Sequence, residues 1–141
     1  MSIHKPVIAV VDDEESICKG LERLLRSVGL TAETFFTGAD FLQFLETTQP
    51  ACVVLDLNMP QMNGFSVLDR LALVSSKLPV IIITGDDSEE AYESAIQYGI
   101  AAYLYKPVDG QVLLEAIAGV VGHDTETQTQ ASNAANGFPK T

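Results

Sequence analysis

The sequence is poor in basic residues, with 8 lysines and arginines against 19 aspartates and glutamates among 141 residues. The resulting formal net charge of −11 would repel a phosphate backbone, so we expect no direct binding of this chain to nucleic acid. A magnesium ion or the basic surface of a partner protein is a better counterpart for so much negative charge.

Cysteine is also scarce, and long apolar runs are absent. The two cysteines, Cys18 and Cys52, form no CxxC pair and have no histidine nearby, which disfavours a zinc or redox site and favours small core residues. No apolar run approaches the roughly 18 residues that a membrane span needs. The sequence therefore predicts a cytoplasmic protein that does not contact a membrane.

The sequence does contain a regular alternation of short β-branched runs and helical patterns. With 47% hydrophobic and 19% charged residues, it fits one compact domain. Strands are predicted at residues 7–11, 31–35, 51–55, 80–84 and 102–104. Helices are predicted at residues 17–28, 39–47, 65–74, 88–98 and 110–121, with Gly29 as the C-cap of the first.

Three of the strand runs, IAVV, CVVL and VIII, are apolar throughout instead of alternating. Such runs are typical of central parallel strands that helices cover on both faces. We therefore predict an α/β fold, a doubly wound (βα)5 domain with a five-stranded parallel sheet, over residues 1–121. Residues 122–141 are polar, with Phe138 their only large apolar side chain, and are predicted to form a disordered tail or the start of a linker.

Candidate functional residues stand at the ends of the predicted strands. Asp12 and Asp13 follow the first strand, Asp56 follows the third, Thr84 ends the fourth and Lys106 follows the fifth. In a doubly wound sheet, ligands bind beyond these carboxyl ends. Carboxylates about 5 Å apart repel by roughly 3 kcal/mol per pair, which requires a counter-ion, and all-oxygen donors favour Mg²⁺ or Mn²⁺ over zinc. Each residue alone has an ordinary alternative, such as an aspartate that caps the following helix.

Four segments in this order, VVDDEES, VVLDLNMPQMNG, IIITG and YLYKP, resemble the receiver domains of two-component response regulators. The resemblance extends over residues 7–121. It implies a flavodoxin-like fold in which Asp56 accepts a phosphoryl group from a sensor histidine kinase or a His-phosphotransfer protein, as an acyl phosphate. It also implies a phosphoacceptor that promotes its own phosphoryl transfer and dephosphorylation, and not an enzyme with a separate substrate.

The resemblance implies a Mg²⁺ site as well. Asp13 and Asp56 would coordinate the ion directly, together with the backbone carbonyl of Asn58, and Asp12 would hold it through a water molecule. Asn58 and Asp86 also occupy positions that in this family influence the attack of water on the acyl phosphate. Their identity alone gives no lifetime for the phosphorylated form.

Residues at the ends of the last two strands would contact the phosphoryl group. Lys106 would bring a compact cation to one phosphoryl oxygen, and its peptide bond to Pro107 is commonly cis in this family. Thr84 would donate its hydroxyl to another oxygen, and Gly85 beside it would leave the group unobstructed. These contacts are expected to hold the switched form.

The resemblance also predicts how the signal leaves the site. Inward movement of Thr84 would let Tyr103 rotate towards the vacated space and change the surface of the fourth helix, fifth strand and fifth helix. Tyr105, two residues on along the same strand face, is a competing candidate. This surface would contact a downstream protein or an output domain absent from this chain, and the resemblance also allows a phosphorylation-dependent dimer.

The kinase would dock on the face that carries the first helix. Ile17, Cys18 and Leu21 lie on this helix near the predicted pocket. The same apolar residues have an alternative place in the core. No particular kinase follows from them.

Three other interpretations of the strand ends stay open. A flavin mononucleotide module shares the architecture but needs a Ser/Thr/Gly-rich loop where this chain has DDEE, and the colour of the purified protein would reveal it. An aspartate-nucleophile phosphatase needs a second aspartate where Asn58 stands, and turnover of a phosphomonoester would reveal it. A receiver fold that serves as a scaffold without phosphorylation is the third.

Overall fold

The computed structural model describes residues 6–75 and 77–121, and in these ranges five strands alternate with five helices. The strands are β1 (Val7–Val11), β2 (Thr31–Phe35), β3 (Cys52–Asp56), β4 (Val80–Thr84) and β5 (Ala102–Tyr105). The helices are α1 (Glu15–Ser27), α2 (Gly38–Phe44), α3 (Gly64–Val74), α4 (Glu89–Ile96) and α5 (Gly110–Val121). The predicted alternation is confirmed, and the boundaries differ from the predicted ones by no more than a few residues.

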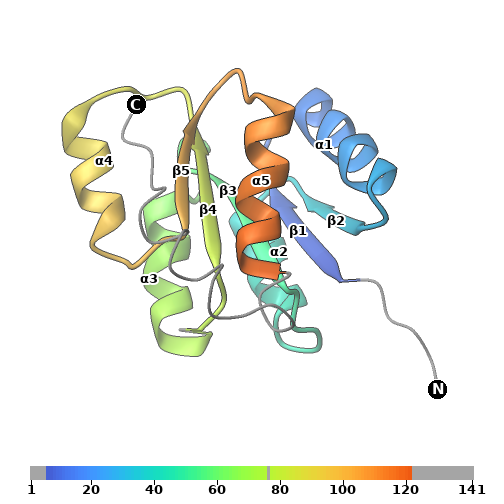
Figure 1. Cartoon of the computed structure of the whole chain (residues 1–141). Helices are drawn as coiled ribbons and strands as arrows, with labels where there is room; N and C mark the ends of the chain where they lie inside the picture. Colours follow the sequence, from blue (N-terminus) through green and yellow to red (C-terminus); the bar gives the residue numbers. More distant parts are fainter. Residues whose placement is uncertain (1–5, 76, 122–141) are drawn as a thin grey trace.

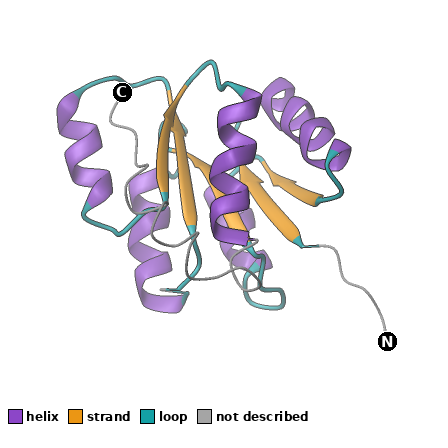
Figure 2. Ribbon diagram, viewed as in Figure 1, coloured by secondary structure: helices purple, strands orange, loops and turns teal. Residues whose placement is uncertain are grey.

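The strands form one parallel sheet in the order β2-β1-β3-β4-β5 (Figure 1). Helices α1 and α5 pack on one face, and α2, α3 and α4 pack on the other; Figure 2 shows the sheet between these layers. This is the doubly wound, flavodoxin-like architecture that the apolar strand runs predict. Because β2 and β3 flank β1 on opposite sides, the carboxyl ends of β1 and β3 border the topological switch point.

The central strands β3 and β4 are buried at every residue. Their side chains alternate between two apolar clusters, one on each face of the sheet. Val53 and Leu55 belong to the cluster beneath α2, α3 and α4, whereas Cys52 and Val54 belong to the cluster beneath α1 and α5. Packing on both faces fixes the carboxyl ends of these strands, which is where the candidate residues lie.

Local chemistry sets the ends of several helices. Thr37, Asn63 and Ser88 are the N-caps of α2, α3 and α4, and the side chain of each accepts a hydrogen bond from a backbone N–H in the first turn. Gly29, the predicted C-cap of α1, follows the cap residue Val28 and has a φ of 87°, which favours glycine. The prediction that Gly29 ends this helix is therefore confirmed, with Val28 as the cap residue directly before it.

Burial decides several predictions about single residues. Cys18 and Cys52 are free and buried, in agreement with their predicted place in the core. Leu21 and Cys18 are buried in the cluster beneath α1, which favours the core alternative for these two residues, and only Ile17 of that group is partly exposed. The predicted tail, residues 122–141, lies outside the described residues. Within the described ranges, no helix has the length and apolar character that crossing a membrane requires.

Candidate functional site

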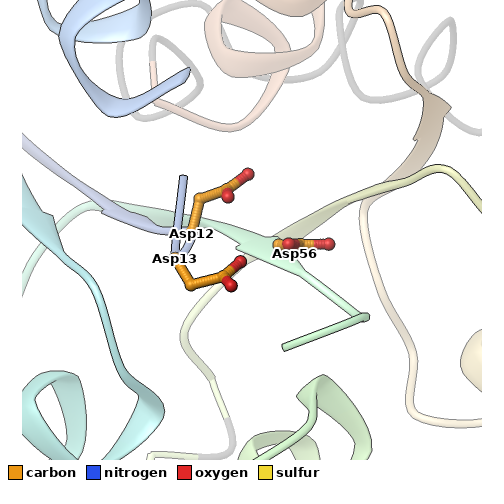
Figure 3. A group of neighbouring side chains, drawn as sticks. All are labelled: Asp12, Asp13 and Asp56. Carbon is orange, nitrogen blue, oxygen red and sulfur yellow. The ribbon is translucent and has the colours of Figure 1, made fainter. Parts of the chain in front are cut away.

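Three carboxylates meet at the carboxyl ends of β1 and β3, as the parallel topology predicts. Asp12 and Asp13 directly follow β1, and Asp56 is the last residue of β3. Each offers an oxygen within 4.8 Å of the others, and Figure 3 shows the Asp12 and Asp13 side chains extending from the end of β1 towards Asp56. Asp12 and Asp56 are buried, at 0% and 2% exposure, whereas Asp13 is exposed. Carboxylate oxygens in this arrangement are the donor set that Mg²⁺ prefers.

Backbone hydrogen bonds hold the two buried carboxylates in place. Oδ1 of Asp12 accepts a hydrogen bond from the backbone N–H of Glu14 at 2.9 Å, and Oδ1 of Asp56 accepts one from the backbone N–H of Asn58 at 3.0 Å. Both are side-chain turns of the kind that Asp favours after a strand. In each residue the other oxygen, Oδ2, is left to face the pocket.

The chain turns sharply behind Asp56 to begin α3. A Cβ atom at Gly64 would lie 2.6 Å from the Cα atom of Leu57, closer than real Cβ atoms approach a neighbour. The backbone N–H of Gly64 donates to the carbonyl of Leu57 at 2.8 Å. Glycine at this position therefore lets the β3–α3 loop fold back and keeps Asn58 beside the acidic cluster.

Lys106 enters the pocket from the end of β5 and contacts three carboxylates. Its Nζ atom lies 2.9 Å from Oδ2 of Asp12, 3.0 Å from Oε1 of Glu14 and 3.4 Å from Oδ2 of Asp56. The contact with Asp12 is an ion pair, since Oδ2 accepts no well-aligned hydrogen bond. Burial alone would lower the pKa of Lys106, but its contacts with Asp12 and Glu14 and the charge of Asp56 raise this pKa above its ordinary value. The lysine is therefore a permanent cation.

Asp56 is the carboxylate whose ionisation the surroundings oppose. Burial raises its pKa to about 6; the N–H of Asn58 acts against this, the charge of Asp12 adds to it, and Lys106 acts against it. One lysine thus fails to neutralise the pocket fully. A divalent cation at the three aspartates would remove the excess negative charge, and the residues present fit such an ion.

Thr84 lies beside the pocket at the end of β4 and is fully buried. Its Oγ1 atom accepts hydrogen bonds from Nδ2 of Asn58 at 3.1 Å and from the backbone N–H of Asp86 at 3.0 Å. A Cβ atom at Gly85 would have no neighbour within 4 Å, so the space beside the threonine is open, as predicted. The four strand ends named by the sequence therefore do converge on one pocket.

Two further predictions concern β5. The peptide bond between Lys106 and Pro107 is cis, as the resemblance implies. Tyr103 is fully buried and packs edge-on against Tyr92 and Tyr105, with ring centroids 5.1 Å and 5.5 Å away. Among the described residues, its hydroxyl has no hydrogen-bond partner. Tyr105 is less buried, so the predicted relay Tyr103 and the competing candidate Tyr105 occupy different environments.

One member of this site, Glu14, was not predicted from the sequence. The contact between Glu14 and Lys106 joins residues 92 positions apart. The run of acids DDEE marks the loop as acidic, but its spacing does not indicate which of the two glutamates faces the lysine. Glu14 joins the site through the fold, because Lys106 after β5 reaches across the carboxyl edge of the sheet to the loop after β1.

The strand order and the buried acidic pocket define a flavodoxin-like α/β domain with its site at the β1/β3 switch point. Within this class, the family model of the response regulator receiver domain matches residues 8–118. The chain therefore belongs to the receiver-domain family of two-component systems, as the four sequence segments predict.

Curated relatives agree with this assignment. The chain is 35% identical over 135 residues to the DNA-binding transcriptional regulator NtrC of Escherichia coli K12, covering 96% of this chain and 29% of that protein. It is 32% identical over 117 residues to the response regulator protein TodT of Pseudomonas putida, covering 83% of this chain and 52% of that protein. The chain thus spans about half or less of the length of these two relatives.

Solved structures show the same fold. A response regulator receiver protein from Burkholderia phymatum is 41% identical, with a TM-score of 0.74 over 84% of this chain and 96% of that one. The signal receiver domain of an HD domain-containing protein from Pseudomonas fluorescens Pf-5 is 31% identical, with a TM-score of 0.80 over 86% of this chain and 98% of that one.

Proposed function

We propose that this domain is a signalling switch in which Asp56 accepts a phosphoryl group. The observation that supports this most is the buried Asp56 carboxylate, held at the switch point with Asp12, Asp13 and Lys106 around it. An oxygen of Asp56 attacks the phosphorus of a phosphohistidine, the P–N bond breaks, and the imidazole leaves with the electron pair. The product is an acyl phosphate on Asp56. The donor is a sensor histidine kinase or a His-phosphotransfer protein.

The proposed metal site uses the three aspartates and the carbonyl oxygen of Asn58. A Mg²⁺ ion bound there would neutralise negative charge on the phosphoryl oxygens during transfer. Asp13 is exposed and close to Asp56, which suits a direct ligand, whereas the buried Asp12 is already paired with Lys106. The closer contact of Lys106 with Asp12, at 2.9 Å against 3.4 Å for Asp56, supports the predicted role of Asp12 as a ligand acting through water.

Lys106 and Thr84 are proposed to hold the phosphorylated form. The ammonium of Lys106 already lies 3.4 Å from Oδ2 of Asp56, so it can reach a phosphoryl oxygen with a small movement. Thr84 must exchange its contacts with Asn58 and Asp86 for a hydrogen bond to the new group. Reversing a two-state equilibrium from 1:99 to 99:1 takes about 5.5 kcal/mol, and two charge-assisted hydrogen bonds contribute about 3 to 6 kcal/mol.

The output of the switch is proposed to pass through Tyr103. Its buried ring contacts Tyr92 of α4 and Tyr105, the residue of β5 that pairs with Thr84. A change at Thr84 would reach α4 through these packed rings. The structure describes the inward position of this ring; exchange with an outward position would change the surface of α4, β5 and α5. A downstream protein, or an output domain outside this chain, would bind one of the two surfaces.

The proposal is tested by intact mass after incubation with acetyl phosphate, with and without Mg²⁺. We expect a gain of one phosphoryl group that requires Mg²⁺ and disappears in Asp56→Asn. Asp40→Asn is the matched control, because Asp40 is an exposed aspartate of α2 distant in sequence from the pocket residues. A phosphoryl gain retained by Asp56→Asn, or no gain with any donor including a histidine kinase, would favour a scaffold of receiver fold.

A further inference from the structure

Glu14 is the one residue of the pocket to which the resemblance assigns no role. Its Oε1 atom accepts a hydrogen bond from Nζ of Lys106 at 3.0 Å. Among the three carboxylates that contact the lysine, Glu14 is the exposed one: its side chain is 57% exposed, against 0% for Asp12 and 2% for Asp56.

Glu14 stands immediately before α1, where its side chain could have capped the helix instead of contacting Lys106. Glu14 is the N-cap of α1, where a short polar side chain normally accepts a hydrogen bond from the first turn. Thr37, Asn63 and Ser88 do so in α2, α3 and α4, but Glu14 makes no side-chain cap hydrogen bond. The side chain therefore supplies no cap hydrogen bond to the helix and is directed to Lys106 instead.

The contact between Glu14 and Lys106 matters because the lysine has a limited number of hydrogen-bond donors. An ammonium group has three N–H donors and no acceptor. Three carboxylates already surround Nζ at 2.9, 3.0 and 3.4 Å. Hydrogen bonds to Glu14 and Asp56 use two of the donors, and the ammonium also forms an ion pair with Asp12. A phosphoryl oxygen that approaches Nζ therefore competes with partners that are already in place.

Of the three partners, Glu14 is the one that can be released at least cost. Releasing Asp12 would leave a fully buried carboxylate without its counter-charge, which is strongly unfavourable. Asp56 is itself the proposed phosphorylation site, so its contact stays within the reacting group. Glu14 is largely exposed, and water replaces the lysine around its carboxylate.

We propose that Glu14 is a positioning residue that holds Lys106 in the unphosphorylated state and competes with the phosphoryl group for it. This inference rests on the proposed function and deepens it. The Glu14–Lys106 pair biases the switch towards the off state, and its release accompanies activation. The strength of this exposed pair therefore sets part of the threshold for switching.

The test measures the affinity for beryllofluoride, a non-covalent phosphoryl mimic, in excess Mg²⁺ by amide NMR titration. Glu14→Gln removes the competing charge and keeps the shape of the side chain. Glu15→Gln is a closely matched control, because Glu15 is the next residue, is 68% exposed and pairs with Lys19 instead of Lys106. We expect Glu14→Gln to bind the mimic about three- to fivefold more tightly than Glu15→Gln does.

Measuring the same two glutamine variants without the lysine separates competition for Lys106 from a general loss of negative charge. With Lys106→Met added, the gap between the two glutamine variants should disappear. Glu14→Ser, which can cap α1 but cannot compete for the lysine, should show the same gain as Glu14→Gln.

Equal affinities in Glu14→Gln and Glu15→Gln, or a gap that persists with Lys106→Met, would overturn the role of Glu14 while leaving the proposed function intact. No Mg²⁺-dependent binding of the mimic by the wild-type protein would overturn the proposed function and this inference with it.

Discussion

In the interior of the sheet, β3 and β4 present buried apolar side chains to both faces, whereas at the carboxyl ends of the strands equally buried positions carry polar groups. Among the described residues, Asp12, Asp56 and Thr84 are the buried polar side chains, and all three stand at or next to a strand end. The interior stabilises the fold. The carboxyl edge costs stability, since the pKa of the buried Asp56 is raised to about 6. In the proposed function, this cost accompanies the phosphorylation site.

The largest expected effect comes from removing apolar volume in the interior. Ile82 lies fully buried in β4, paired with Leu55 on one side and Tyr103 on the other. Because the core on both faces prevents collapse, Ile82→Ala should lower the free energy of unfolding by about 4 kcal/mol. Urea unfolding measures it, with Leu73→Ala as control, since Leu73 is 81% exposed and should change stability little. Equal losses in the two variants would remove the contrast between interior and surface.

A substitution at the carboxyl edge is expected to raise the free energy of unfolding instead of lowering it. The pKa of Asp56 is about 6 in the folded protein, above its ordinary value of 3.8. Its stabilising contribution is therefore complete below about pH 4 and is lost as the pH rises through 6, because only the unfolded chain ionises freely. At pH 7 without Mg²⁺, Asp56→Asn should raise the free energy of unfolding by about 2 to 3 kcal/mol.

This gain should shrink towards pH 4, because the Asp56 carboxyl is then protonated in the folded state and partly protonated in the unfolded chain. Urea unfolding of wild type and Asp56→Asn at several pH values, in the presence of a chelator, measures the difference. A gain that is the same at pH 4 and pH 7 would show that ionisation of Asp56 is not its cause.

Magnesium should recover part of the stability that the acidic edge costs. At a Mg²⁺ concentration ten times its Kd, binding to the folded state alone adds about 1.4 kcal/mol to the free energy of unfolding. Asp13→Asn should abolish most of this gain, and Asp40→Asn should keep it, since Asp13 is in the cluster and Asp40 is on α2. Thermal unfolding with and without Mg²⁺ gives the comparison, and an unchanged gain in Asp13→Asn contradicts the proposed ligand set.

The smallest effect is expected at Tyr103, whose hydroxyl is a polar atom buried in the apolar interior. Burial and the nearby Tyr105, Asp86 and Tyr92 raise the pKa of Tyr103 to about 12, so its hydroxyl stays protonated, and no described residue accepts from it. Tyr103→Phe should therefore stabilise the inward position by up to about 1 kcal/mol. Urea unfolding tests this, and a loss above 1 kcal/mol would mean that the hydroxyl has a partner.

Most of the fold could be predicted because strands that are buried on both faces allow few arrangements of the sheet and its helices. The apolar runs around Val53 and Ile82 indicated central parallel strands, and parallel strands bring Asp12, Asp13 and Asp56 to one edge. The ends of the helices and strands were predicted only approximately, because the sequence pattern indicates where an element ends less clearly than it indicates the element itself. The strand β3 includes Asp56 itself, because its backbone pairs with Ile83 although its side chain is polar.

Contacts between distant loops could not be predicted. The Glu14–Lys106 pair depends on how an exposed side chain turns in a loop, which neither spacing nor periodicity determines. Tyr103 and Tyr105 share one strand face, so periodicity could not separate them. The difference lies in what covers them, because Tyr103 packs against Tyr92 of α4 and is fully buried.

The central claim is that the carboxyl edge is kept for phosphorylation of Asp56, and chemical trapping tests it most directly. Borohydride reduces an acyl phosphate to an alcohol and so turns a phosphorylated aspartate into homoserine. After treatment with acetyl phosphate and Mg²⁺, peptide mass spectrometry should find homoserine at position 56, and none when Mg²⁺ is chelated. Homoserine at another aspartate, or aspartate unchanged at position 56 in a protein that has gained a phosphoryl group, would contradict the account.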